Sequence, residues 1–437
     1  MNEGDVLMSS PHDPPLTRRR ALARAAIGLA APLVVPRSVL GGAGLPGPNQ
    51  RVGIGAIGVG GRAALLLEQL PEGGRIVALS DCNLPRAEAF KARKGGNWPV
   101  YGDYRKLLER GDLDAVLVAT GDFQRVLPCI HACQAGKDIY AEKPLTLYIR
   151  EGRVLVDAVR RYQRVLQCGS QQRSMAINQI ACEWVRSGGL GTITEVRAMN
   201  YPGPQDSPAQ PFAEEPVPGG LNWDAWLNQA AWRPYNPEWM SWMRWRDFSG
   251  GQMTNWGAHG ADQIQWALGM DGSGPLEMWP VTGGPNGAVR MRYASGVEVH
   301  FVLETGKGPM GGAVFIGREG KLEINRNKCT SNPKEIAEEL LKKVDVAEEE
   351  RKWSDQLALW QARWHMQNWL DCIRSRRKPV ADVEIGHRSI TVCHLANITR
   401  WVGRPLKWDP VQEQFVGDEP ANRLVDRPRR KGYELPA

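Results

Sequence analysis

The sequence predicts an α/β protein in which a doubly wound parallel sheet comes first and an α+β domain with an open, mainly antiparallel sheet follows. Strand-like and helix-like segments alternate between residues 51 and 141, as in a parallel sheet covered by helices. A glycine-rich turn joins the first strand to the first helix. After residue 192, strand-like segments come in pairs joined by short turns, which is typical of antiparallel hairpins. The 437 residues suffice for two domains of ordinary size.

The first 50 residues are expected to lie outside both domains, as an export signal and a linker. Residues 17–35 read TRRRALARAAIGLAAPLVV, which resembles a twin-arginine export signal with a weakly apolar, alanine-rich core. The alternative interpretation is a solvated, arginine-rich tail. If the segment is a signal, the protein folds before it is exported, to the periplasm or otherwise out of the cytosol, and carries a bound cofactor with it.

Composition and charge argue against other classes of protein. The net charge is +7, but Lys and Arg are interspersed with Asp and Glu, so no nucleic-acid partner is expected. The longest apolar run, residues 25–35, is shorter than the roughly 20 residues of a membrane span, so no membrane association is expected after signal removal. The eight cysteines show no CxxC pair and no zinc-type spacing, so we predict neither a metal site nor a disulfide framework.

The first strand, turn and helix have the spacing of a dinucleotide-binding site. Residues 51–57 alternate as a strand does, and residues 63–70 begin a helix. Between them, Gly58 allows a tight turn and Gly60 lets backbone N–H groups approach a pyrophosphate, as in a Rossmann domain. The residues of this turn expected to bind the cofactor are Gly58, Gly60, Gly61 and Arg62.

The second strand, residues 75–81 (RIVALSD), ends in Asp81 about 20 residues after the glycines. A carboxylate at this position accepts hydrogen bonds from both ribose hydroxyls and repels a 2′-phosphate, so NAD is expected as the cofactor rather than NADP. The alternative is a strand-end or helix-capping role, because Asn83 and Pro85 follow.

The alternation continues through a first domain predicted to span residues 51–173. The further elements expected are helices at 84–94 and 104–110, a strand at 113–120, a helix at 124–135 and a strand at 137–141. A doubly wound sheet binds its ligand at the carboxyl ends of the strands. Thr120, Glu142 and Lys143 lie at such ends and are expected to bind the cofactor.

Five sequence motifs follow one another along the chain, each occurring once. They are GVGGRA (58–63), ALSD (78–81), AEKPL (141–145), GSQQRS (169–174) and SGGQMTNWGAHGADQIQWALG (249–269). In combination they resemble the Gfo/Idh/MocA family, named for glucose–fructose oxidoreductase, inositol dehydrogenase and the MocA protein. The resemblance covers most of the chain from residue 51 to about residue 410, and it implies an NAD-dependent oxidoreductase.

The resemblance also implies catalytic residues. In the family, the lysine of the EKP motif lies beside the nicotinamide and the reacting hydroxyl, and this residue is Lys143 here; its pKa is expected to be lowered. A family helix carries Asp and His four residues apart, which correspond to Asn255 and His259, with His259 as the general base. Asn255 departs from the pattern, since an amide cannot hold a charged imidazolium. We hypothesise that Asp262, three residues beyond His259, supplies the missing charge.

A second departure lies at residues 121–124 (GDFQ), where relatives often carry histidines. This loop is therefore expected to serve the cofactor side of the site without taking part in the chemistry.

The second domain is predicted to span residues 174–410, followed by a polar C-terminal tail at 411–437. The elements expected are a helix at 175–187, a strand at 192–201, hairpins within 288–303 and 313–324, and helices near 355–375 and 388–402. The open sheet is expected to pair with another subunit, which gives a homo-oligomer.

Eight of the seventeen tryptophans lie within residues 221–266. Flat aromatic faces suit the C–H surfaces of sugar rings, although tryptophans also build cores and interfaces, so only a minority are expected to touch a substrate. The residues expected to contact the substrate are Gln171, Gln172, Arg173, Tyr201 and Trp256.

Taken together, these patterns predict an enzyme that transfers hydride between a retained NAD and the alcohol of a small carbohydrate or cyclitol. An exported enzyme that keeps its cofactor must regenerate it in the same site, by reducing a second substrate or by a redox-neutral cycle. An NAD-dependent glycosidase or epimerase is therefore an alternative. Because Asn255 departs from the family pattern, a non-catalytic nucleotide- or sugar-binding protein is a further alternative.

Overall fold

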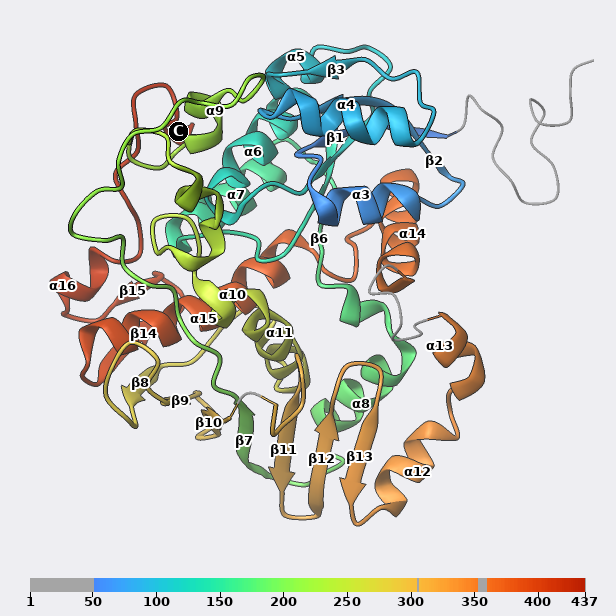
Figure 1. Ribbon diagram of the computed structural model, residues 1–437. Coiled ribbons are helices and arrows are strands. Elements are labelled where there is room, and N and C mark those ends of the chain that lie inside the picture. The colour runs from blue at the N-terminus through green and yellow to red at the C-terminus, as the bar shows by residue number, and fades with distance from the viewer. Residues whose placement is uncertain (1–50, 305, 353–359, 437) are drawn as a thin grey trace, which may run out of the picture. The chain divides into compact units, whose positions relative to one another are not determined.

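The computed structural model describes residues 51–304, 306–352 and 360–436, and the expected export signal at residues 1–50 lies outside them. The described chain forms two β-sheets, each covered by helices (Figure 1). Within this part of the chain, no helix combines the length and the apolar character needed to cross a membrane.

The first sheet is parallel, with the strand order β3-β2-β1-β4-β5-β6, as the doubly wound prediction requires. Its strands are β1 (Val52–Ile57), β2 (Gly74–Ser80), β3 (Val100–Tyr101), β4 (Ala115–Val118), β5 (Asp138–Ala141) and β6 (Leu166–Cys168). The sequence did not predict β3 and β6, because two and three residues are too few to show a periodicity.

Helices follow the strands of this sheet on both faces. They are α3 (Gly61–Glu68), α4 (Leu84–Arg93), α5 (Tyr104–Leu108), the 3-10 turn η2 (Asp122–Gln124), α6 (Val126–Gln134) and α7 (Ile149–Arg161). Capping side chains start two of them: Asn83 accepts from the backbone N–H of Arg86, and Asp103 accepts from that of Arg105. A helix from far along the chain, α14 (Trp360–Ser375), also covers this sheet beside α3 (Figure 1), where Trp369 packs edge-on against Tyr140.

The second sheet is open, and its neighbouring strands are antiparallel except for the β7–β10 pair. The strand order is β13-β12-β11-β7-β10-β9-β8-β14-β15. The strands are β7 (Ile193–Met199), β8 (Glu277–Pro280), β9 (Val289–Arg292), β10 (Glu298–Leu303), β11 (Ala313–Gly317), β12 (Gly320–Ile324), β13 (Cys329–Asn332), β14 (Leu406–Asp409) and β15 (Gln414–Phe415). The two predicted hairpins are β9–β10 and β11–β12, so the predicted fold class is confirmed for both sheets.

The remaining helices lie among and beside these sheets. They are η3 (Gln171–Ser174), α8 (Ala176–Arg186), α9 (Trp223–Leu227), η4 (Pro237–Met240), η5 (Trp242–Arg244), α10 (Gly251–Asn255), α11 (Gly257–Ala267), α12 (Glu335–Leu341), α13 (Val346–Lys352), α15 (Val383–Val402) and α16 (Glu419–Asn422). Helix α11 packs against α8 and α15, and every one of its residues is buried. Its polar side chains therefore need partners inside the protein.

The chain after Pro405 is folded, although the sequence was expected to give a polar tail there and at 411–437. Strand β14 extends the second sheet, β15 pairs with β14, and α16 follows. Trp408 and Phe415 are buried and their rings meet edge-on, 5.0 Å apart between centroids. Isolated apolar residues among many charged ones gave no periodic signal, yet these few side chains are enough to fix the segment. The boundaries of the two domains stay a prediction.

Candidate active site

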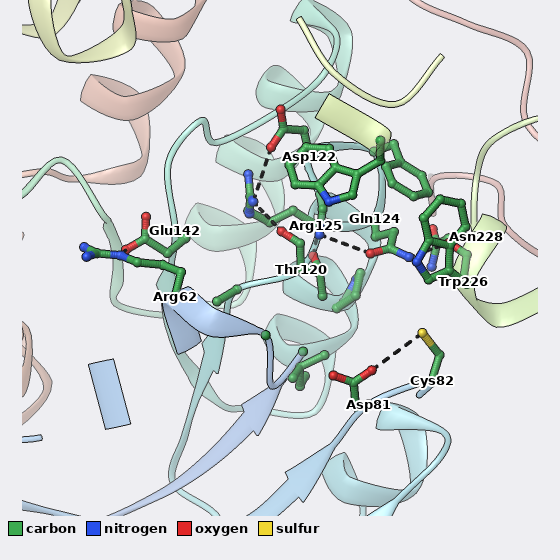
Figure 2. A pocket seen from close by; sticks show the side chains of 18 of the residues that line it. Arg62, Asp81, Cys82, Thr120, Asp122, Gln124, Arg125, Glu142, Trp226 and Asn228 are labelled. Carbon is green, nitrogen blue, oxygen red and sulfur yellow. Dashed lines mark hydrogen bonds and ion pairs between the residues drawn. The ribbon is translucent and has the colours of Figure 1, made fainter. Parts of the chain in front are cut away.

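A cavity of about 660 Å³ lies at the carboxyl ends of β1, β2, β4 and β5 (Figure 2). Residues of α9, α10 and α11 line it together with the loops that follow these strands. Twelve of the site residues expected from the sequence line this cavity: Gly58, Gly60, Gly61, Arg62, Asp81, Thr120, Glu142, Lys143, Gln171, Asn255, Trp256 and His259. The cavity therefore brings together motifs that are about 200 residues apart in the chain.

The glycine turn leaves room for a ligand. Gly58 has a positive φ of 80°, a conformation that favours glycine, and a side chain at Gly61 would meet no atom within 4 Å. Helix α3 begins at Gly61, and in the described structure no side chain caps its first turn. Unpaired backbone N–H groups at such a helix start suit a pyrophosphate.

The Asp81 carboxylate connects the ends of β1 and β2. Its Oδ2 accepts from the backbone N–H of Val59 at 2.8 Å, and its Oδ1 accepts from that of Asn83 at 2.8 Å. Both expected roles are thus compatible, because each oxygen has a second lone pair that a ribose hydroxyl can use. Arg86 lies 3.7 Å from Asp81, at the same end of the cavity.

Glu142 and Arg62 form an ion pair on the opposite side of the turn (Figure 2). Arg62 Nε donates to Glu142 Oε1 at 2.8 Å, and the backbone N–H of Lys143 donates to Oε2 at 3.0 Å. Burial acts to raise the pKa of Glu142, but Arg62 and Lys143 outweigh it and the pKa is lowered. Arg62 Nη2 is buried without a hydrogen-bond partner among the described residues, so a donor is left for a ligand at the cavity.

Lys143 bonds to Asn255, which stands where the resemblance implies an aspartate. Its Nζ donates to Asn255 Oδ1 at 2.8 Å and to the Asn255 backbone oxygen at 3.2 Å. Burial lowers the pKa of Lys143 to about 8, while Glu142 and Asp122 act in the opposite direction. The direction of this shift agrees with the expectation, although burial causes it here rather than the charge of a nicotinamide ring.

His259 lies on α11 and is only 5% exposed. Burial, together with the positive charges of Lys143 and Arg326, holds the pKa of His259 well below its ordinary value of 6.5. The imidazole is therefore neutral at neutral pH. Gly311 packs directly behind it, since a side chain at Gly311 would come within 2.9 Å of His259 Cβ.

Asp262 and Arg173 form a buried ion pair instead of the roles expected of them. Arg173 Nε lies 2.9 Å from both carboxylate oxygens of Asp262, and Arg173 also pairs with Asp271. Ser389 donates to Asp262 Oδ1 at 2.7 Å. The structure thus uses the Asp262 charge to hold Arg173, which corrects the hypothesis that this charge serves His259.

Two other expected substrate contacts, Gln172 and Tyr201, form hydrogen bonds within the protein. Gln172 is buried and accepts from Asn178 at 3.2 Å, and Tyr201 Oη accepts from the backbone N–H of Gly311 at 3.3 Å. The cavity lining formed by the described residues includes neither of them, nor Arg173 or Asp262. Of the five expected substrate contacts, the cavity keeps Gln171 and Trp256.

Asp122 is a cavity residue that the sequence did not single out, although its loop, 121–124, was expected on the cofactor side. Its Oδ2 accepts from Ser249 Oγ at 3.1 Å, and Arg125 lies 3.5 Å from its Oδ1 (Figure 2). Burial raises the pKa of Asp122 to about 6, against the opposite effects of Arg125 and Lys143. The sequence signal was present, because a carboxylate in the loop that follows β4 lies at the ligand edge of the sheet.

The tryptophan-rich segment supplies both core and cavity. Trp223, Trp239 and Trp245 are buried in an aromatic cluster with Phe123 and Phe248. The tryptophans that line the cavity are Trp226, Trp242 and Trp256.

Other residues that line the cavity were not expected from the sequence. They include Arg86, Tyr104, Arg105, Asn228, Arg326 and Tyr433. Through the described ranges, no three His, Cys, Asp or Glu side chains lie close enough together to hold a metal ion.

These features define a dinucleotide-binding protein of the oxidoreductase class. Residues 51–170 match the family model described as the oxidoreductase family NAD-binding Rossmann fold, and residues 205–435 match the C-terminal alpha/beta domain of the same family. The chain belongs to the Gfo/Idh/MocA oxidoreductase family, and NAD is the cofactor of its first domain.

Individual relatives agree with this assignment. The chain is 33% identical to an inositol 2-dehydrogenase of Klebsiella pneumoniae over 117 residues, which is 26% of this chain and 35% of that enzyme. The WlbA dehydrogenase of Bordetella pertussis, solved with NADH and UDP-GlcNAcA, has a similar fold with a TM-score of 0.60 at 16% identity, over 83% of this chain and 99% of that one. An aldose-aldose oxidoreductase of Caulobacter crescentus, solved with glycerol, gives 0.56 at 15% identity, over 82% and 99%.

Proposed function

We propose that this protein oxidises or reduces an alcohol carbon of a sugar or cyclitol, with NAD as the hydride carrier. The observation that carries the proposal is that Lys143 and His259 line one cavity with the glycine turn and Asp81. Relatives that act on inositol and on aldoses have the same family or fold. The Rossmann turn, Asp81 and Arg62 hold the dinucleotide in this proposal, and NAD, when bound, takes up or returns the hydride.

The described side chains supply the acid–base chemistry. In the oxidation direction, the neutral His259 imidazole accepts the hydroxyl proton of the substrate while the hydride leaves the same carbon, so a carbonyl forms. The Lys143 ammonium, held by Asn255, donates a hydrogen bond to the substrate oxygen and stabilises the charge that develops there. The reverse steps return both the proton and the hydride, so the protons and electrons balance in either direction.

Turnover of a panel of sugars and cyclitols tests the proposal, followed by nicotinamide absorbance. Lys143→Met should lower kcat by about 10²–10⁴-fold, because it removes the donor to the reacting oxygen. Its NAD affinity should change much less. The matched control is Lys321→Met, which removes an exposed lysine of β12 in the second sheet. If the wild-type protein binds no NAD, or if Lys143→Met keeps full activity, the proposal is wrong.

A redox-neutral cycle in the same site is the second candidate, as in a glycosidase or epimerase. The C-terminal segment favours it, because Tyr433 lines the cavity and reaches it from outside the parallel sheet. Release of an aglycone, or an epimerised sugar, without net formation of NADH would select this candidate. Net NADH formation in proportion to product would select the first.

We also propose that the protein is exported and that it forms a homo-oligomer. The export proposal rests on the arginines of residues 17–35, and replacing Arg18 and Arg19 with lysine should keep the protein in the cytosol.

The oligomer proposal rests on the open sheet. A partly exposed row of polar and charged side chains lies on β7 and β10, formed by Glu195, Arg197, Glu298 and His300. Light scattering of the purified protein, with Arg197→Glu as the disruptive variant, measures the assembly.

A further inference from the structure

The last described residues of the chain, 427–436, run back to the cofactor cavity, and we name them the C-terminal strap. Arg427 Nη2 donates to the backbone oxygen of Phe123 at 2.9 Å, in the loop between β4 and α6. Arg427 also lies 3.1 Å from Glu151 of α7. Both carboxylate and arginine are nearly fully buried, so the start of the strap is anchored to the first domain.

The far end of the strap is bonded to α9. Arg430 pairs with the Asp224 carboxylate and donates to the backbone oxygens of Asp224 and Asn228, both at 2.8 Å. Tyr433 Oη donates to Asp224 Oδ2 at 2.8 Å, and the Gln229 side chain donates to the Tyr433 backbone oxygen at 3.3 Å. One carboxylate, Asp224, thus connects two strap residues to α9.

Helix α9 is also tied to the floor of the cavity. The Gln124 side chain, at the end of η2, donates to the backbone oxygen of Trp226 (Figure 2). Asn222, Asp224, Trp226 and Asn228 all line the cavity, as does Tyr433. The strap and α9 therefore form one wall, and this wall faces the ends of the parallel strands.

Tyr433 lies at the adenosine end of the cavity. Asp81 marks the adenosine ribose in a Rossmann domain, and the lining next to it comes from Cys82, Arg86 and residues 102–105. The backbone N–H of Asn222, at the start of α9, donates to the backbone oxygen of Cys82 at 2.8 Å, so α9 and the Tyr433 side chain bonded to it lie beside Asp81. Tyr104, Arg105 and Tyr433 thus line the same cavity although they lie far apart in the sequence.

We propose that the C-terminal strap retains the dinucleotide: Tyr433 contacts the adenosine half of NAD, and the Asp224–Arg430–Tyr433 network must open before NAD leaves or enters. The proposal rests on the proposed function only in that NAD occupies this cavity. Its consequence is that NAD stays bound from one turnover to the next, which suits either a two-substrate exchange or a redox-neutral cycle.

Rate measurements on the full chain test the strap. The protein is loaded with NADH, an excess of NAD is added, and loss of bound NADH fluorescence gives the dissociation rate; stopped-flow mixing gives the association rate. Tyr433→Ala should raise the dissociation rate at least tenfold, because it removes both the adenosine contact and the bond to Asp224. Arg430→Ala should raise both rates, because it removes bonds between the C-terminal strap and α9 but keeps the Tyr433 ring.

Two further variants separate the strap from general damage to the fold. Tyr433→Phe keeps the ring and loses only the bond to Asp224, so its dissociation rate should lie between those of wild type and Tyr433→Ala. Lys431→Ala changes an exposed residue of the same strap and should leave both rates unchanged. Thermal unfolding checks that all variants are folded.

The possible outcomes are distinct. If Tyr433→Ala and Arg430→Ala exchange NADH within twofold of Lys431→Ala, the strap proposal is overturned while the proposed NAD-dependent function stands. If wild-type protein exchanges NADH freely on mixing, the strap retains nothing and the proposal is overturned in the same way. If wild-type protein binds no NADH, both proposals fail. No sugar substrate is needed for any of these measurements.

Discussion

The hydrogen bond between Lys143 and Asn255 sets how the centre of the cavity titrates. Burial already lowers the pKa of Lys143 to about 8, and the amide of Asn255 accepts a hydrogen bond without adding a negative charge. A carboxylate in the same place would favour the ammonium form. The departure from the family pattern at residue 255 thus changes the protonation of a neighbouring lysine more directly than that of His259.

Asn255→Asp tests this interpretation. The new carboxylate would lie about 3 Å from Lys143 Nζ, so it should raise the pKa of Lys143 by about 1–3 units. If protonated Lys143 is the active form, the alkaline limb of the pH–rate profile should move to higher pH by the same amount. Asn255→Ala, which removes the acceptor without adding charge, should not move it upward. An unchanged alkaline limb in Asn255→Asp would show that Lys143 does not govern it.

At the level of the helices, the Asp262 carboxylate joins three elements through its bonds to Arg173 and Ser389. Arg173 lies in η3, Asp262 in α11 and Ser389 in α15, and the side chains of all three are buried. The i, i+3 spacing placed Asp262 one helical turn from His259, and both residues lie on α11. It could not show which neighbouring element would meet the carboxylate, because that depends on how the helices pack.

Asp262→Asn should therefore destabilise the protein without changing its acid–base chemistry. Removing one partner of a buried ion pair typically costs about 3–5 kcal/mol, and Asp271, which also contacts Arg173, offsets part of this. Urea unfolding measures the loss, and the pH–rate profile at saturating substrate should keep its shape. Asp271→Asn, at the more exposed partner, should cost less. A shifted profile in Asp262→Asn would restore the hypothesis that Asp262 acts through His259.

The sequence predicted those parts of the site that local patterns encode. The glycine turn, Asp81 and Lys143 follow directly from strands whose periodicity is visible, and all of them line the cavity. Asp122 was within reach, because it lies at the same strand edge, but its loop lacked the expected histidines. Tyr433 was beyond reach, since only tertiary packing brings this residue from the last part of the chain to the cavity.

Over the whole chain, buried neutral histidines make stability depend on pH. Burial lowers the pKa of His365 to about 4 and that of His394 to about 3, and His259 is shifted in the same direction. In the unfolded chain these residues titrate near their ordinary value of 6.5. Below that pH the unfolded state takes up protons that the folded state does not, so stability is full above about pH 6.5 and falls as the pH drops.

Between pH 7 and pH 5, His365 and His394 should each cost about 2 kcal/mol of stability, since one pKa unit corresponds to about 1.4 kcal/mol. His394→Gln removes one of these protonation sites, while its amide can still donate to the Thr146 backbone oxygen as His394 Nε2 does now. Denaturant unfolding at pH 7 and pH 5 should show that the variant loses about 2 kcal/mol less than wild type over this interval. Val392→Ala, a cavity-forming change in the same helix α15, should lower stability equally at both pH values. If His394→Gln and wild type lose the same stability on acidification, His394 is protonated in the folded protein and the buried-neutral assignment is wrong.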